Sequence, residues 1–320
     1  MKVNVTIIAT ALFLVCSYAM LPCSAQEVKI GRPPFTTQER FDGYQISSYR
    51  FDVSPDGQEM IFIVDLGGYY TELWTAHIDG ADARRLHRIE GADKVSPNYE
   101  FIFSPKYSPD GNRVGFLKTG SKQGTTLSVL DLATGTAKNV VTAKISPYEI
   151  GWKDNSHMYF TKWDRVSRIR TLYQIKIDGT EMKSIVSGKF DKAYSSPDGK
   201  KVCLLYRHIV YSPSITGGTK YRDHYTVEMF YPQSMRRVEI IGEDRKFQGH
   251  HPVWAPDGSA LIFRVSRPHP HGLRIGTDGK DEEIVAEGTV WAWSNKNFIL
   301  YTREGLVYKR DKVAFKQSKM

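Results

Sequence analysis

Five side chains in two short segments of the chain could ligate a metal ion. His250 and His251 are adjacent, with Gln248 just before them, and His269 and His271 flank a single proline. Neutral imidazoles bind divalent transition metals readily, and the side-chain oxygen of Gln248 could add a further contact. His251, His269, His271 and Gln248 are therefore the candidate ligands of a divalent metal site, although their spacing alone is not diagnostic of one. Surface loops also collect histidine and proline without binding anything, so a ligand-free polar loop cluster stays open as the alternative.

A four-residue turn motif recurs along the chain and indicates how such segments could be brought together. Ser-Pro-Asp-Gly stands at residues 54–57, 108–111 and 196–199, and Ala-Pro-Asp-Gly stands at residues 255–258. Proline fixes φ, aspartate caps the backbone and glycine takes positive φ, so each copy predicts a tight reversal between two strands. Degenerate copies at residues 150–156 and 291–295 precede apolar strands in the same way, which makes six repeats.

Repeats of about 40 to 55 residues with about four strands each are typical of β-propeller blades. We predict an all-β fold, a six-bladed β-propeller of four-stranded antiparallel blades that occupies residues 26–320. In the first blade we expect strands at residues 49–53, 60–64, 72–77 and 84–87. The sixth blade is short of a strand, and residues 27–30 could supply it and close the ring. We expect three tryptophans at equivalent blade positions to fill the core: Trp152, Trp254 and Trp293.

The first 25 residues have the pattern of a secretory signal peptide. Lys2 precedes an apolar run at residues 5–15, and the small residues Ser24 and Ala25 precede a cleavage point before Gln26. A membrane anchor is the alternative, but the run is short for a span and Pro22 interrupts its end. We therefore expect a periplasmic or secreted protein with no transmembrane segment after cleavage.

Cysteine content, net charge and the motifs present limit which partners and reactions we expect for this chain. Cleavage would leave Cys203 as the single cysteine, so no internal disulfide is expected, while lipidation at Cys23 stays open. The formal charge of +9 favours anionic partners, but no stacking motif of nucleic-acid binders is present, and we expect no nucleic-acid partner. The chain contains no nucleophile elbow, zinc-protease helix motif or phosphate loop. We expect a monomer.

Propeller topology converts the repeats into a map of the channel mouth. The loop that enters each inner strand and the loop between second and third strands lie on one face, and the Pro-Asp-Gly turns lie on the other. The ligand-binding candidates at this mouth are Arg50, Tyr148, Glu149, Asp191, Lys192, His250 and His251. Adjacent strand residues point to opposite sides, so at most one of His250 and His251 faces the channel axis, and we favour His251. A long loop of the fourth blade adds His208, Arg222, Asp223 and His224.

The units at residues 107–116 and 251–263 resemble the WD40-like repeats of the TolB propeller, which has six blades. Similar repeats occur in periplasmic binding proteins, in prolyl-oligopeptidase-type propellers and in oligogalacturonate lyases, so the resemblance specifies fold better than function. The lyases hold a divalent metal, typically manganese, with histidines and a glutamine at the propeller mouth. By that resemblance His251 would be the ligand ahead of the turn, with Gln248, His269 and His271 as further candidates. Those lyases differ in having seven blades and a longer chain.

Two functions follow from these observations. The leading hypothesis is an exported binding module that recognises a protein or an anionic glycan at the channel mouth, without catalysis. The alternative is a metal-assisted polysaccharide lyase that performs β-elimination on uronate-containing glycans. Elimination requires neutralisation of the sugar carboxylate and a base that removes the adjacent proton. The candidates for this catalytic role are Lys192, Arg222 and His224.

Overall fold

The computed structural model describes residues 27–31, 51–65, 71–89, 100–120, 124–143, 145–213, 219–266, 269–303 and 306–311. Within these ranges the chain is all-β, apart from the short 3₁₀ helix η1 (Glu243–Arg245). No helix in the described part is both long enough and apolar enough to cross a membrane. The signal peptide expected at residues 1–25 lies outside the described residues.

The strands form six four-stranded sheets, as the repeats predicted. Blade 1 contains β2 (Phe51–Val53), β3 (Glu59–Asp65), β4 (Thr71–His77) and β5 (Arg84–Arg88). Blade 2 contains β6 (Glu100–Tyr107), β7 (Arg113–Gly120), β8 (Gly124–Asp131) and β9 (Ala137–Ala143). Blade 3 contains β10 (Ile145–Asp154), β11 (His157–Asp164), β12 (Ile169–Lys176) and β13 (Lys183–Gly188). Blade 4 contains β14 (Lys192–Ser195), β15 (Val202–Pro213), β16 (Thr219–Tyr231) and β17 (Arg236–Ile241). Blade 5 contains β18 (Gly249–Trp254), β19 (Ala260–Val265), β20 (His271–Gly276) and β21 (Glu283–Ala286).

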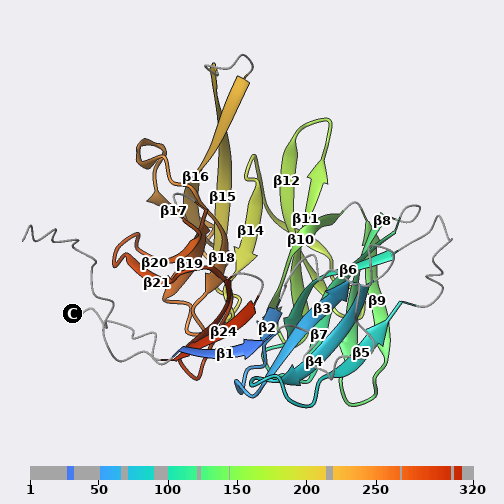
Figure 1. The fold of residues 1–320 in the computed structure, drawn as a ribbon. Coiled ribbons are helices and arrows are strands. Elements are labelled where there is room, and N and C mark those ends of the chain that lie inside the picture. The colour runs from blue at the N-terminus through green and yellow to red at the C-terminus, as the bar shows by residue number, and fades with distance from the viewer. Residues whose placement is uncertain are drawn as a thin grey trace, which may run out of the picture.

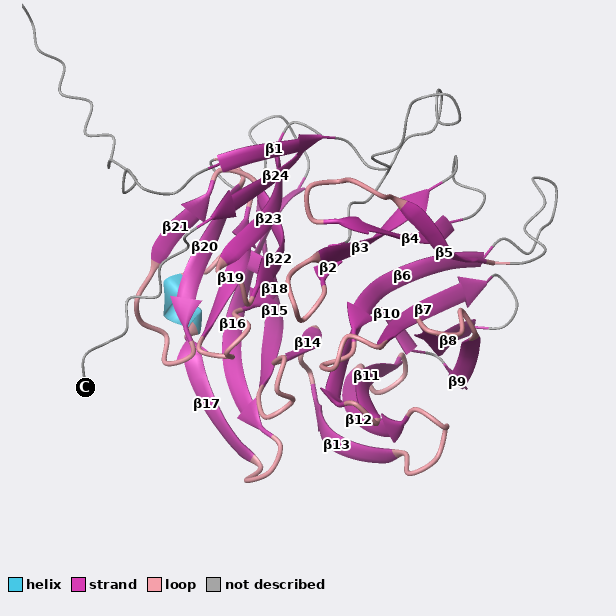
Figure 2. Ribbon diagram, turned by 90° about the horizontal axis from the view of Figure 1, so that it is seen from below, coloured by secondary structure: helices cyan, strands magenta, loops and turns pink. Residues whose placement is uncertain are grey.

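Blade 6 is completed by a strand from the other end of the chain. Its sheet has the order β1-β24-β23-β22, in which β22 is Thr289–Ser294, β23 is Phe298–Arg303 and β24 is Leu306–Asp311. β1 (Glu27–Gly31) pairs antiparallel with β24, and the two strands lie side by side in Figures 1 and 2. The prediction of a closing strand at residues 27–30 is confirmed.

Among the described residues, six apolar clusters hold the blades together, each between two neighbouring blades. The cluster between blades 4 and 5 includes Leu205, Val227 and Phe263, all buried. The cluster between blades 1 and 6 includes Phe62 and Leu300, so the last blade packs against the first. The blades are therefore arranged as a closed ring, which Figure 2 shows along a direction close to its axis.

The equivalent tryptophans are buried between blades, as expected. Trp152 Nε1 donates a hydrogen bond to the carbonyl oxygen of Lys106 at 3.0 Å, and Trp254 Nε1 donates to that of Tyr194 at the same distance. Each bond joins an inner strand to the inner strand of the preceding blade. The same residues thus fill the core and set the spacing around the channel.

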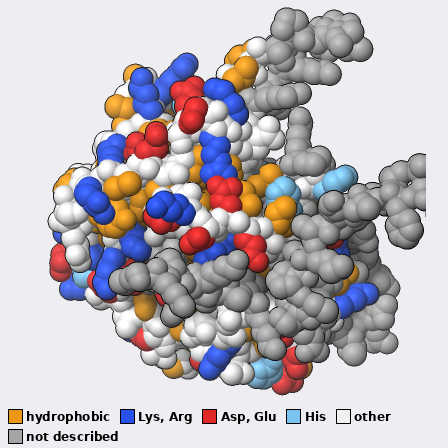
Figure 3. All heavy atoms as spheres, turned by 90° about the vertical axis from the view of Figure 1, so that its left-hand side faces the viewer, with side chains coloured by type: hydrophobic (Ala, Val, Ile, Leu, Met, Phe, Trp, Pro, Cys, Tyr) orange, Lys and Arg blue, Asp and Glu red, His pale blue; other side chains and the backbone are white. Residues whose placement is uncertain are grey.

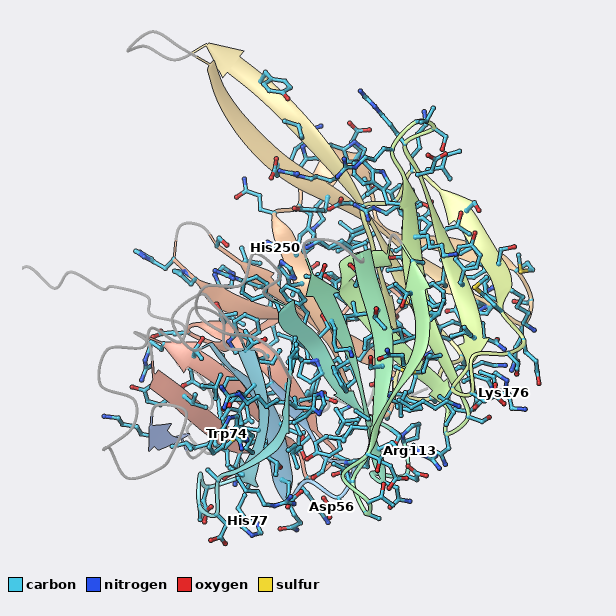
Figure 4. All side chains as sticks on the ribbon, turned by 90° about the vertical axis from the view of Figure 1, so that its right-hand side faces the viewer. Asp56, Trp74, His77, Arg113, Lys176 and His250 are labelled. Carbon is cyan, nitrogen blue, oxygen red and sulfur yellow. The ribbon has the colours of Figure 1, made fainter. Side chains whose placement is uncertain are left out.

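The Pro-Asp-Gly turns have the local structure that their residues predict. In the first copy Ser54 Oγ donates to Asp56 Oδ1 at 2.6 Å, the backbone N–H of Gln58 donates to the same oxygen at 3.0 Å, and Gly57 has φ of +72°. These hydrogen bonds lower the pKa of Asp56. Figure 4 shows Asp56 at the bottom of the molecule and His250 well above it, which places this turn away from His250.

Blade 4 differs from the sequence prediction. The residues expected to form a long loop instead continue β15 and β16 as one hairpin, paired without interruption from Val202–Phe230 to Pro213–Thr219. The hairpin projects beyond the other blades in Figure 1. Its sequence is rich in β-branched and aromatic residues and contains no turn motif until residue 213, so strand pairing extends to that point. His208 and His224 therefore lie on strands and not on a loop.

Candidate functional site

A cavity of about 640 Å³ occupies the centre of the ring, and every inner strand contributes to its lining. The lining side chains that can form polar or aromatic contacts with a ligand include Asp52, Lys106, Tyr194, His251, Arg264 and Trp291. Lys106 Nζ lies 3.1 Å from Asp52 Oδ1, so these two charges pair with each other. We use the term upper mouth for the end of the cavity at Lys192, Tyr194, His251 and Arg264.

A β-bulge directs His251 into the cavity. On β18 the pairing with β19 shifts between His250 and Val253, and His251 takes a φ of +48°. β6 has the same irregularity at Ser104, where φ is +49° and a proline again follows. Bulges re-aim side chains, and a non-glycine residue in this region costs on the order of 1–3 kcal/mol. The residue that faces the channel therefore has a strained backbone.

His251 contacts two residues of blade 4. Lys192 Nζ lies 3.2 Å from His251 Nε2, and the Tyr194 hydroxyl oxygen lies 3.3 Å from His251 Nδ1. Because a lysine ammonium only donates, Nε2 accepts, and the imidazole proton sits on Nδ1, from which it is donated to Tyr194. These two contacts hold the imidazole of His251 at the junction of blades 4 and 5 and place the Lys192 ammonium beside it.

Arg264 brings a second positive charge to the upper mouth. It lies on β19 directly opposite His250 and lines the cavity. Its Nε is buried and donates no hydrogen bond to any residue that the structure describes. A buried donor without an acceptor costs free energy, and a ligand carboxylate is a geometric match for a guanidinium. Nε itself is shielded from the cavity, so the suitability of Arg264 for an anionic ligand rests on its positive charge in the cavity lining. Arg264 is not among the candidates predicted from the sequence.

His250 lies behind His251 and is not among the residues that line the cavity. Its ring is stacked near that of Tyr225, with 6.1 Å between centroids, and its Nδ1 lies 3.4 Å from the carbonyl oxygen of Gln248. Burial lowers the pKa of His250, so this imidazole is neutral at pH 7. Through its contact with Tyr225, His250 packs the bulged part of β18 against blade 4.

The other residues predicted to bind a ligand or a metal ion do not gather at the upper mouth in the part of the chain that the structure describes. Asp191 accepts a hydrogen bond from Arg170 Nη2 at 3.4 Å. His271 Nδ1 lies 2.9 Å from the carbonyl oxygen of His269. Gln248, His269 and His271 are absent from the cavity lining. Arg50 and the side chains of Tyr148, Glu149 and Arg222 lie outside the described residues.

A different set of side chains assembles metal-ligand atoms. His208, His224 and Glu243 place one ligand atom each within 4.8 Å of the others. His251, His269, His271 and Gln248 are not part of this group, and both ring nitrogens of His251 already contact Lys192 and Tyr194. The Lys192 ammonium beside Nε2 repels a cation. This contact argues against the metal site predicted at His251. The hairpin register, which pairs His208 with His224, was the missing signal.

His224, one of the catalytic candidates, is buried away from the cavity lining. Burial lowers the pKa of His224, and the charges of Lys246 and His208 lower it further. Its ring stacks on that of His208, with 4.9 Å between centroids. Of the three catalytic candidates, Lys192 lies beside the cavity, through its contact with His251.

The outer surface shows no segregation of charge on the side drawn in Figure 3. Lys and Arg side chains are interspersed there with Asp and Glu side chains. The positive groups of the upper mouth are thus a local feature and not part of a broad basic face on this side.

Comparison with known proteins identifies the fold. No protein-family profile and no curated protein sequence matches the chain. Among solved structures, TolB from Acinetobacter baumannii has a TM-score of 0.53 at 17% identity, over 83% of this chain and 63% of that one. Oligogalacturonate lyase in complex with manganese has a TM-score of 0.54 at 12% identity, over 83% and 77% of the two chains. The β-propeller domain of the Trilobed protease from Pyrococcus furiosus gives 0.53 at 13% identity, over 85% and 86%.

The chain has a TolB-like β-propeller fold. The match spans 63% of the length of the Acinetobacter TolB chain, and the identities are low, so the likeness concerns the fold alone. It confirms the resemblance that the repeats indicated.

Proposed function

We propose that this protein is a binding module that recognises a carboxylate-bearing ligand, an anionic glycan or an acidic protein segment, at the upper mouth of its channel. The positive charge of Arg264 in the cavity lining carries the proposal. Lys192, placed beside His251, adds a second cation, and Tyr194 and Trp291 offer aromatic surface to a sugar ring or side chain. We propose binding without catalysis as the function of this site.

The proposal includes export to the periplasm or the medium, with removal of residues 1–25. The apolar run at residues 5–15 and the TolB-like fold support it. N-terminal sequencing of the protein from fractionated cells tests this part.

Isothermal titration with defined anionic polymers tests the binding function. The purified protein is titrated with oligogalacturonate and with polyglutamate, and with neutral dextran as the control. We expect one of the anionic probes to bind, with an affinity that falls as salt is added, because the attraction between exposed charges is screened. Absence of binding to both probes, or binding that dextran matches, would contradict the proposal.

The same titration examines the lyase alternative, which the fold shared with a manganese-bound oligogalacturonate lyase favours. Lys192 would act as the base, and Arg264 would neutralise the sugar carboxylate. Elimination produces an unsaturated uronide with strong ultraviolet absorbance. An increase in absorbance with oligogalacturonate, with or without added manganese, would replace the binding function with catalysis.

A further inference from the structure

The base of the β15–β16 hairpin carries a group of side chains that the channel does not use. His208 on β15 and His224 on β16 lie directly opposite each other, and Glu243 begins η1 in the connection between β17 and β18. His224 Nε2 lies 3.8 Å from Glu243 Oε1, and His208 Nδ1 lies 4.0 Å from the same oxygen. Three ligand atoms from three elements thus surround one point.

His224 has a buried nitrogen that the protein does not satisfy. Its side chain is only 6% exposed, and Nε2 has no hydrogen-bond partner among the described residues. The 3.8 Å separation from Glu243 is too long for a hydrogen bond. Leaving a buried polar atom unpaired is costly and rare in folded proteins. A metal ion between Nε2 and the carboxylate would satisfy Nε2, and it would displace the exposed Lys246 ammonium, which lies 3.9 Å from the same Glu243 oxygen.

His208 is oriented by a second contact. Its Nε2 lies 3.3 Å from Thr226 Oγ1, on the side of the ring away from Glu243. A proton on Nε2, donated to Thr226, leaves the lone pair of Nδ1 available to a metal ion. Metal-bound histidines are typically held in this way through the nitrogen that does not bind the metal.

We propose that His208 Nδ1, His224 Nε2 and a carboxylate oxygen of Glu243 bind one divalent transition-metal ion of the zinc class. Two imidazoles and a carboxylate form a ligand set that zinc uses with a fourth, open position. Metal–ligand distances of about 2.0–2.2 Å in a tetrahedral site imply ligand separations of about 3.4 Å. The two separations from Glu243, 3.8 and 4.0 Å, exceed this by about half an ångström, and all three ligand atoms lie within 4.8 Å of one another. The Glu243 side chain is 61% exposed, so it can move and gives the ion access from solvent.

Metal binding here would connect the hairpin to the upper mouth. The ion would join β15 and β16 to η1, and η1 leads within a few residues to Gln248 and to the bulge at His251. The site is separate from the channel, so its test does not depend on whether an anionic ligand binds there.

Cobalt titration of the full chain tests the proposal. Co²⁺ bound by two imidazoles and a carboxylate in a site of low coordination gives visible absorption bands. We expect bands that saturate at one equivalent of Co²⁺ and disappear when Zn²⁺ is added. Glu243→Gln, at an exposed position, should weaken Co²⁺ binding at least tenfold, and His208→Asn should do the same. Asp244→Asn is the matched control, because Asp244 is the next acidic residue of η1 and lies outside the group.

A double variant, His269→Asn with His271→Asn, distinguishes this site from the metal site predicted on the sequence. It should bind Co²⁺ as the unaltered protein does. The proposal is overturned if the unaltered protein gives no saturable bands. It is equally overturned if Glu243→Gln and His208→Asn both retain the full affinity, or if the double variant alone loses it. Thermal unfolding of each variant without metal checks that it is folded.

Discussion

At the scale of residues, the channel site depends on side chains that their neighbours hold in one orientation. His251 is fixed by Lys192 and Tyr194, and Arg264 lines the same cavity. The types of these residues could be read from the sequence, and His251 was selected from its place before a turn. Arg264 could not be selected, because only the packed structure shows that it lines the same cavity as His251.

Asp154 gives a residue-scale prediction about pH. Burial alone would raise the pKa of Asp154, but hydrogen bonds from the Ser156 hydroxyl and backbone N–H and from His157 lower it to about 2. A carboxyl whose folded pKa lies below its ordinary 3.8 stabilises the fold above that pH, and this contribution is lost as the pH falls through 3.8 toward 2. Asp154→Asn should therefore lower the free energy of unfolding at pH 7 by about 1 kcal/mol, a figure reduced for solvent exposure.

Urea unfolding of the unaltered protein and of Asp154→Asn, repeated from neutral pH downward, measures this difference. The two stabilities should converge as the solution becomes more acidic than the ordinary aspartate pKa. A difference that stays constant with pH would show that Asp154 does not contribute through its charge.

At the scale of elements, the turns that join first to second strands also contact the neighbouring blade. Gly199 has φ of +66°, and a Cβ there would lie 2.6 Å from Lys153 Cα of blade 3 and closer still to its carbonyl oxygen. Gly135 has a similar φ of +68° but nothing within 4 Å. Gly135→Ala should cost about 1 kcal/mol, from positive φ alone, whereas Gly199→Ala should cost about 3 kcal/mol, because backbone atoms must also move.

Equilibrium urea unfolding of both glycine variants, side by side, separates the two costs. Equal destabilisation would mean that the turns do not contribute to the contact between blades.

The elements also show which parts of the fold a sequence can specify. The turns and the closing strand were predictable, because proline, aspartate and glycine each impose a known local conformation and a short last blade requires a partner. The length of the β15–β16 hairpin was not, because no residue before its tip marks an end to pairing. The His208, His224 and Glu243 group was missed for the same reason, since cross-strand register alone places the two histidines opposite each other.

At the scale of the whole molecule, the ring is what creates the site. Lys192 and Tyr194 belong to blade 4, His251 and Arg264 belong to blade 5, and the remaining lining comes from the other inner strands. Packing between all pairs of neighbouring blades, including the first and the last, fixes the positions of these residues around one axis. A polar group in the channel is therefore positioned by the closure of the ring and not by its own blade alone.

The most direct test of this account is the affinity for the anionic probe after charge reversal at each end of the molecule. Lys192→Glu reverses a charge at the upper mouth, and Lys138→Glu reverses an exposed one on β9, close to the turn that follows β8 and far from the mouth. Both variants change the net charge equally, so a general attraction would weaken equally in both. We predict that Lys192→Glu weakens binding at least tenfold, while Lys138→Glu leaves it within about twofold. Equal effects of the two substitutions, or no effect of Lys192→Glu, would contradict a binding site at the upper mouth.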